Sequence, residues 1–271
     1  MTSGSSEAEA ARVGLIVNPI AGLGGRVGLK GTDGEGVADR ARDLGARPQA
    51  MARAAAALSR LAAVWPGDRP RPRLLCAAGD MGQRSASAAG WEAEVVGQAP
   101  AVTSAADTRR LAVVLAEAGV AVLLFAGGDG TARDVHEAVG DRVPALGIPA
   151  GVKVQSAVFA TSPGAAGEIA AQHLAGTGRT VEREVLDLDE DAYREGRVQP
   201  RLHGVLRVPA GRLLQSRKAP TPGSDATASR SIAAEVESML QPGRRYILGP
   251  GTTTRAVAER LGLDKTLVGV D

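Results

Sequence analysis

Short apolar runs alternate with amphipathic stretches through the first 178 residues of the chain. Runs rich in Val, Leu, Ile and Ala that end at Gly, Pro or Asn predict buried strands. Such runs occupy residues 12–18, 73–78, 94–96, 120–126 and 143–148. Helical spacing of apolar residues is found at residues 38–64 with a break near Gly45 and Pro48, at 83–89, at 104–119, in the stretch that follows Thr131 and stops at Gly140, and at 163–174. This alternation predicts an α/β fold with a doubly wound, Rossmann-like parallel sheet.

A change in pattern near residue 179 predicts a second, smaller and β-rich domain. Its expected strands cover residues 183–188, 201–208 and 246–248, and its expected helices cover 231–240 and 255–261. The polar stretch 216–230 contains Pro and Gly and is expected to be flexible. The predicted organisation is therefore a disordered tail (1–11), an α/β nucleotide-binding domain (12–178) and a β-rich domain (179–271).

Composition narrows the class of protein. Aromatic residues make up only 2% of the chain, so the core must be built from Ala, Val and Leu. The 32 basic and 30 acidic residues nearly balance, and no aromatic stripe accompanies the basic ones, which argues against nucleic-acid binding. The single cysteine, Cys76, lies in an apolar run and is expected in the core. With neither a membrane-spanning run nor a signal peptide in view, we expect a cytoplasmic protein that binds no membrane.

The main candidate for chemistry is the stretch LLFAGGDGTARDV, residues 123–135. An apolar strand ends there at Gly127-Gly128-Asp129-Gly130-Thr131, and a helical pattern follows. Ligands collect at the carboxyl ends of parallel strands, glycines admit a phosphate close to the backbone, and a helix start attracts anions. Asp129 would repel a phosphate unless a metal ion or a substrate hydroxyl lies between them. The loop therefore indicates phosphoryl transfer rather than plain nucleotide binding.

This five-residue signature resembles that of NAD kinases and of diacylglycerol and sphingosine lipid kinases. The wider sequence is similar to a bacterial ATP-NAD kinase-like branch that includes accessory proteins of acetoin catabolism. The similar stretches are residues 14–34, 123–135, 147–163 and 246–262. The resemblance implies an NAD kinase-like fold, ATP or polyphosphate as phosphoryl donor with Mg²⁺, and NAD as acceptor. It also implies a possible homo-oligomer and a C-terminus truncated relative to most members.

Several further residues become candidates through this resemblance. Asn18, Lys30 and Asp33 would face the cleft of Asp129, with Lys30 pairing with a phosphate and Asn18 positioning a ligand or metal. From spacing alone, the loop around Lys30 fits neither the dinucleotide-binding pattern G-x-G-x-x-G nor the phosphate-loop pattern G-x-x-x-x-G-K-[ST]. It could equally be a surface loop. Lys153 lies past a strand end, although an ordinary surface lysine is an alternative. Glycine and hydroxyl groups at Gly251, Thr252 and Thr253 form a second candidate phosphate site, or alternatively a threonine helix cap.

The resemblance implies that Asp129 accepts the proton of the ribose 2′-hydroxyl of NAD, which attacks the terminal phosphate to make NADP. Gly127, Gly128, Gly130 and Thr131 would hold the phosphates. The Asn-Glu pair that holds the acceptor in NAD kinases is missing from residues 147–153, so the acceptor stays open. Two alternatives remain: a non-catalytic NAD- or ATP-binding accessory protein, and a lipid kinase. Isolated histidines and the lack of a His/Cys cluster predict no protein-built metal site.

Overall fold

The computed structural model describes residues 10–23, 27, 36–150, 154–188, 200–215, 224–249 and 251–265. A five-stranded sheet lies at its centre, in the order β3-β2-β1-β4-β5. The strands are β1 (Arg12–Val17), β2 (Arg73–Ala77), β3 (Ala93–Gly97), β4 (Val122–Gly127) and β5 (Ala145–Pro149). All neighbouring strands pair in parallel. The predicted α/β fold with a Rossmann-like parallel sheet is confirmed.

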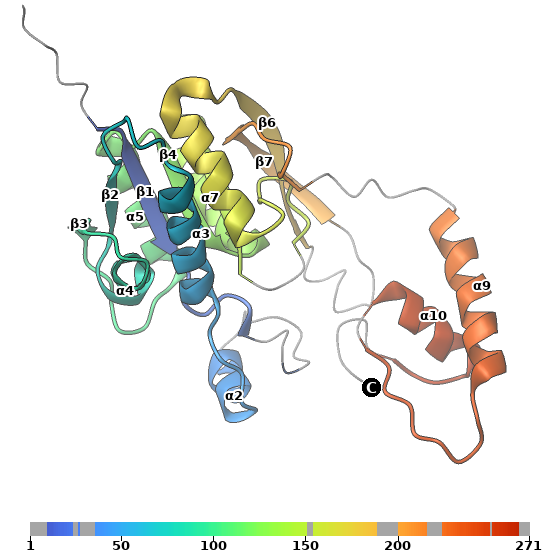
Figure 1. Ribbon diagram of the computed structural model, residues 1–271. Helices are drawn as coiled ribbons and strands as arrows, with labels where there is room; N and C mark the ends of the chain where they lie inside the picture. The colour runs from blue at the N-terminus through green and yellow to red at the C-terminus, as the bar shows by residue number, and fades with distance from the viewer. Residues whose placement is uncertain are drawn as a thin grey trace, which may run out of the picture. The chain divides into compact units, whose positions relative to one another are not determined.

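Helices cover both faces of this sheet (Figure 1). One face carries α3 (Ala50–Val64), α4 (Gln83–Ala88) and α7 (Pro163–Gln172), and the other carries α5 (Ala105–Glu117) and α6 (Asp129–Val139). A short 3₁₀ turn, η1 (Gly79–Met81), follows β2. The chain winds outward from β1 through β2 to β3 and then crosses back to β4. Right-handed crossovers in opposite directions place their helices on opposite faces. The strand order reverses between β1 and β4, where such sheets bind ligands beyond the carboxyl ends of the strands.

Local sequence signals account for several helix starts. The Asp107 carboxylate accepts hydrogen bonds from the backbone N–H of Ser104 at 3.0 Å and from its hydroxyl at 2.8 Å, so the predicted start of α5 is confirmed. Ser162 caps α7 by accepting from the backbone N–H of Ala165, and Pro163 occupies the first turn. The helix that begins at Gln83 has no hydrogen bond from a side-chain cap among the described residues.

The core is built mainly from Ala, Val, Leu and Ile, as the composition required. Both phenylalanines of the chain, Phe125 and Phe159, are fully buried and pack edge to face, with ring centroids 5.4 Å apart. The ring of Phe159 lies directly on Gly147 in β5, where any Cβ would overlap it. Cys76 is buried within the same core, and burial raises the pKa of its thiol to about 11. The predicted core position of this cysteine is confirmed.

A separate two-stranded antiparallel sheet follows α7 and the π-helical turn η2 (His173–Thr177). Its strands are β6 (Thr180–Leu188) and β7 (Pro200–Pro209), and their register shifts between Val185 and Leu186. This β6–β7 hairpin packs against α6 and β5. The contact is close because Gly204 of β7 lies against the ring of His136 of α6, where a Cβ would overlap the imidazole.

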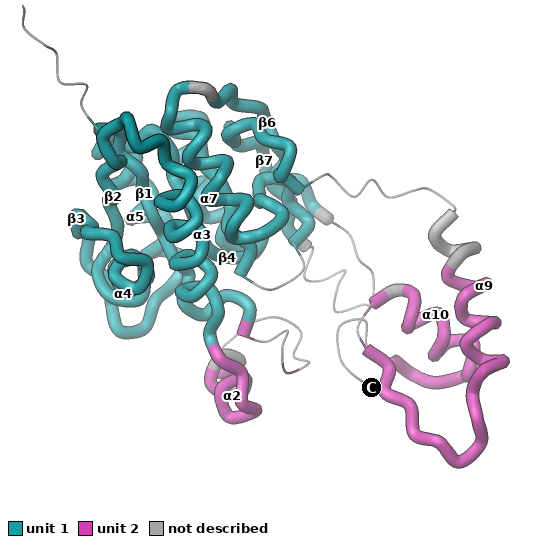
Figure 2. Tube along the Cα trace, viewed as in Figure 1, with its two compact units in different colours: residues 1–22, 48–188, 200–217 teal, residues 23–47, 189–199, 218–271 magenta. Residues whose placement is uncertain are grey.

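The chain divides into two compact units (Figure 2). The first comprises residues 1–22, 48–188 and 200–217, and the second comprises 23–47, 189–199 and 218–271. The β6–β7 hairpin thus belongs to the first unit, although it lies beyond the expected boundary at residue 179. The second unit contains α2 (Val37–Asp43) and two helices that pack together, α9 (Ser224–Met239) and α10 (Thr252–Arg260).

Two local predictions in this part of the chain were wrong. Residues 246–248 form no strand, because no strand of the described chain pairs with them. Part of the stretch expected to be flexible, residues 224–230, is the start of α9, which packs against α10. Within the described residues, no helix is both long and apolar enough to cross a membrane.

Candidate functional site

The glycine-rich loop lies where β4 ends and α6 begins. Gly128 precedes α6, and Asp129 is the first residue of the helix. Gly127 is required by packing, because a Cβ there would overlap the side chain of Thr131. The backbone N–H of Ala150, just beyond β5, donates to the carbonyl of Gly127 at 3.2 Å. The loop is therefore fixed between the ends of two neighbouring strands.

Asn18 joins this loop to the end of β1. Its side-chain amide donates to the hydroxyl of the buried Thr131, with Nδ2 and Oγ1 3.0 Å apart. Its backbone N–H donates to the carbonyl of Ala126 at the end of β4. Its amide oxygen accepts from the backbone N–H of Ile20, which fixes the orientation of the side chain. Asn18 and the glycine loop, which the sequence placed together, thus meet where the strand order reverses.

The carboxylate of Asp129 is held by two backbone groups. Oδ2 accepts from the N–H of Gln155 at 2.7 Å, and Oδ1 accepts from the N–H of Ser156 at 2.9 Å. Burial raises the pKa of the Asp129 carboxyl above its ordinary value, hydrogen bonds from Ser156 and Gln155 oppose this shift, and the negative charge of Asp187 adds to it. A carboxylate with a raised pKa is a stronger base at neutral pH than an exposed aspartate.

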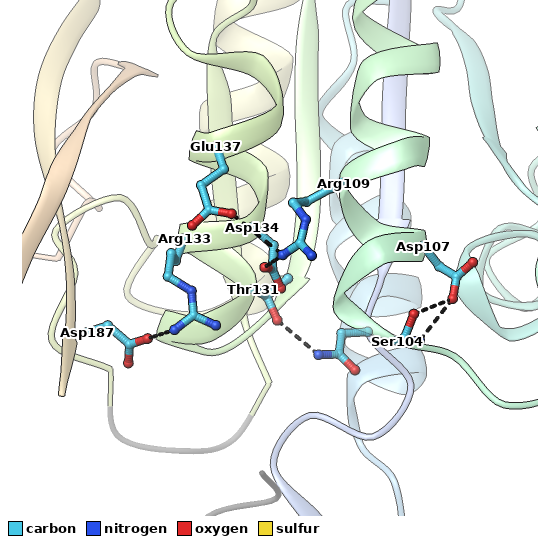
Figure 3. A network of polar contacts seen from close by, with 9 residues as sticks. Ser104, Asp107, Arg109, Thr131, Arg133, Asp134, Glu137 and Asp187 are labelled. Atoms are coloured by element: carbon cyan, nitrogen blue, oxygen red, sulfur yellow. Dashed lines mark hydrogen bonds and ion pairs between the residues drawn. The ribbon is translucent and has the colours of Figure 1, made fainter. Parts of the chain in front are cut away.

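Ser156 connects this arrangement to the β6–β7 hairpin. Its side chain is only 1% exposed, and its hydroxyl donates to the carbonyl of Leu186 at 2.8 Å. The same oxygen accepts from the backbone N–H of Leu186 at 3.0 Å. One residue further along β6, the Asp187 carboxylate accepts from Nη1 of Arg133 at 2.6 Å. Because Arg133 is one turn after Asp129 on α6, a closed network links the start of α6, residues 155–156 and β6. Figure 3 shows the contact between Arg133 and Asp187 that completes it.

A second set of charges occupies another side of α6. Asp134 is buried, and its carboxylate accepts from Nη1 of Arg109 on α5 at 2.6 Å. Burial raises the pKa of Asp134, and the neighbouring arginines oppose that shift. Figure 3 shows Arg109 with Asp134 and Glu137, apart from Arg133 and Asp187. This ion pair joins α5 to α6 and is separate from the backbone hydrogen bonds that hold Asp129.

The remaining predicted site residues lie either outside the described residues or in the second unit. Lys30, Asp33 and Lys153 lie outside the described residues. Gly251 and Thr253 are at the start of α10, as is the backbone of Thr252, and all three belong to the second unit. The side-chain hydrogen bond at this helix start is made by Thr254, whose Oγ1 lies 2.6 Å from the carbonyl oxygen of Gly249. The second candidate phosphate site thus stays a prediction.

The sequence did not indicate Ser156, Arg133 or Asp187. The network depends on which face each side chain of β6 occupies, and the register shift after Val185 changes that face relative to simple alternation. The one local signal was the spacing of Asp129 and Arg133, which places both on one side of a helix. Nothing in the sequence identified the strand that would pair with them.

The described residues contain no group of three or more His, Cys, Asp or Glu side chains suited to hold a metal ion. Both Asp129 oxygens already accept backbone hydrogen bonds. Mg²⁺ is commonly bound through one or two carboxylates together with substrate phosphates and water. The site therefore fits an ion that arrives with a nucleotide, and not an ion held in a cage of protein ligands alone.

The comparison with protein families agrees with this geometry. The model of the ATP-NAD kinase N-terminal domain family matches residues 13–177, more than half of the chain. The chain belongs to this family. The match includes β1 with Asn18, the glycine loop and α6, and it ends before β6. Family membership supports a kinase-type, nucleotide-binding function. Neither the search of curated proteins nor that of solved structures gave a significant match.

Proposed function

We propose that the protein is a phosphotransferase that moves the terminal phosphoryl group of ATP, or of polyphosphate, to a hydroxyl group of NAD or a related nucleotide. The observation that carries this proposal is the position of Asp129: a partly buried carboxylate with a raised pKa at the first turn of α6, held by two backbone N–H groups. It lies in a glycine loop at the reversal of strand order, where a phosphate can approach the backbone.

In the proposed reaction, Asp129 accepts the proton of the acceptor hydroxyl as that oxygen attacks the terminal phosphorus. A new O–P bond forms, and the bond from that phosphorus to the bridging oxygen of the donor breaks, which releases ADP or a shortened polyphosphate. Two backbone N–H groups aim the carboxylate before substrate binds. When bound with the nucleotide, Mg²⁺ neutralises charge on the phosphates.

Thr131 and Asn18 have a supporting part in this scheme. Their hydrogen bond fixes the first turn of α6 against the end of β1, so the loop glycines keep one conformation. Phosphoryl transfer depends on positioning and on charge stabilisation more than on covalent chemistry. A loop held in one conformation, with its backbone N–H groups toward the phosphates, would supply the positioning.

The test is phosphate transfer with ATP and Mg²⁺, and separately with polyphosphate, across NAD, NADH and small alcohols. Wild type is compared with Asp129→Asn, and Asp134→Asn serves as the matched control because Asp134 is a second aspartate of α6, itself buried, whose pKa is also raised by burial. A general base contributes about 10²- to 10⁴-fold to the rate. We expect Asp129→Asn to lose activity on that order and Asp134→Asn to retain it.

One observation favours a second candidate, a nucleotide-binding accessory protein without turnover. Each oxygen of Asp129 already accepts one backbone N–H, so this carboxylate could serve only to anchor residues 155–156. Binding of ATP or NAD by wild type with no product from any acceptor would support this candidate. It would also refute the kinase proposal.

A further inference from the structure

Two glycines of the loop are present for different reasons. At Gly127, the overlap of any Cβ with Thr131 explains the residue by packing alone. Gly130 lies within α6 and does not have a positive φ, so its backbone conformation does not require glycine. Among the described residues, the one atom within 4 Å of a Cβ placed there is Nη2 of Arg133, at 4.0 Å. Alanine would favour the helix, so the described fold gives no reason for glycine at this position.

What Gly130 leaves is an open surface beside a guanidinium group. Arg133 is only partly buried, with its side chain 35% exposed. Its Nη1 donates to the carboxylate of Asp187 (Figure 3), and Arg133 lies one helical turn after Asp129 on α6. A guanidinium has five N–H donors, so the contact with Asp187 leaves others for a ligand. Nη2 is the nitrogen nearer Gly130. A guanidinium group is planar and can bind phosphate oxygens through two N–H groups at once.

Charge explains why a cation is needed here. Asp129 and Asp187 are close enough for the charge of one to affect the other. A phosphate that approached these two carboxylates alone would be repelled. Arg133 supplies a positive charge that contacts Asp187 through Nη1 and lies beside Gly130 through Nη2. Asp187 then has a definite part, since it fixes the rotamer of an otherwise flexible arginine.

We propose that Arg133, oriented by Asp187, binds a phosphate oxygen of the donor over the open face of Gly130. This inference rests on the proposed function, and it adds a ligand-contacting residue that lies outside the five-residue signature. The ligand class is a polyphosphate chain, free or as part of a nucleotide. Arg133 touches the substrate, whereas Asp187 acts through Arg133 and is a positioning residue.

The experiment measures binding separately from turnover. Isothermal titration calorimetry with ATP and with inorganic tripolyphosphate, each with Mg²⁺, compares wild type with Arg133→Gln, Arg133→Lys and Gly130→Ala. Loss of a charge-assisted hydrogen bond weakens binding by about 10- to 100-fold, and we expect Arg133→Gln to show this for both probes. The affinity of Arg133→Lys should lie between those of wild type and Arg133→Gln, because lysine keeps the charge and lacks the planar guanidinium. Gly130→Ala should weaken binding without lowering the melting temperature, since its methyl group meets no described atom closer than 4.0 Å.

Arg109→Gln is the matched control, because Arg109 forms an ion pair with another acid of α6. It should leave both affinities unchanged. Asp187→Asn should weaken binding less than Arg133→Gln does. The double variant Asp187→Asn/Arg133→Gln should bind no more weakly than Arg133→Gln alone.

Three results would overturn the inference. These are wild-type affinity in Arg133→Gln, an equal loss in Arg109→Gln, and the absence of binding of either probe by wild type. Binding that depends on Arg133, with no product from any acceptor, would refute the kinase proposal and leave this inference standing.

Discussion

Replacement of Ser156 by alanine tests whether the hydrogen bonds behind Asp129 control its chemistry. The hydroxyl of Ser156 satisfies both the N–H and the carbonyl of Leu186. Its loss leaves both backbone groups of the partly buried Leu186 without this partner, and each unsatisfied buried group costs about 1–3 kcal/mol. We therefore expect the free energy of unfolding to fall by at least about 2 kcal/mol. For a domain of this size that corresponds to a melting temperature roughly 4–8 °C lower.

The same substitution should change the ionisation of Asp129. The Ser156 hydrogen bonds lower the pKa of this carboxyl against the effect of burial. Without the hydroxyl, the segment that donates to Asp129 is no longer tied to β6, and the pKa rises further. A base must be deprotonated to act, so the acidic limb of the pH profile of kcat/KM should move to higher pH. Arg133 and Asp187 are unchanged in this variant, so we expect their charges near Asp129 to be the same as in wild type.

Ser85→Ala is the matched control for both measurements. Ser85 is also 1% exposed, but its hydroxyl has no hydrogen-bond partner within the part of the chain that the structure describes. Its removal should change neither the melting temperature by more than about 2 °C nor the pH profile. Thermal unfolding and initial rates between pH 4 and pH 9 give both quantities. An unchanged pH profile in Ser156→Ala, together with the expected loss of stability, would show that the serine supports the fold and has no effect on Asp129.

Three further outcomes are expected. In wild type, the acidic limb of kcat/KM should lie above the ordinary aspartate pKa of about 3.9, because burial raises the pKa of Asp129; a limb at the ordinary value would contradict its role as base. Gly147→Ala should lower the free energy of unfolding by about 1–3 kcal/mol, since a Cβ would overlap the ring of Phe159, and urea denaturation that shows no change would contradict this packing. Cys76 should react with a thiol reagent such as DTNB only on unfolding, because it is buried and its thiol pKa is about 11; rapid labelling of native protein at pH 8 would contradict this.

The sheet and the glycine loop could be predicted from the sequence because both have local causes. A buried parallel strand is a short apolar run, and the turn at its end needs glycine wherever it packs as closely as Gly127 does on Thr131. The start of α5 was equally local, since Ser104 and Asp107 are three residues apart. Such signals are complete within a few residues of sequence.

The rest of the site depends on contacts between distant segments. Ser156 and Leu186 are 30 residues apart, and Arg133 and Asp187 are 54 apart. Their meeting depends on the register of β6, which shifts after Val185. The strand predicted at residues 246–248 was wrong for a related reason. An apolar run becomes a strand only where another strand offers its backbone groups, and the described chain provides none there.

The network at Asp129 also bears on how the protein can be divided. The family match ends at residue 177, yet the groups that hold residues 155–156 and Arg133 come from Leu186 and Asp187. A fragment cut at the end of the match would keep all five strands of the central sheet and the whole signature. It would lack β6, whose Leu186 and Asp187 form hydrogen bonds with Ser156 and Arg133. A fragment meant to keep this site must therefore extend at least to the end of β7. Transfer of the domain to another protein must include the β6–β7 hairpin.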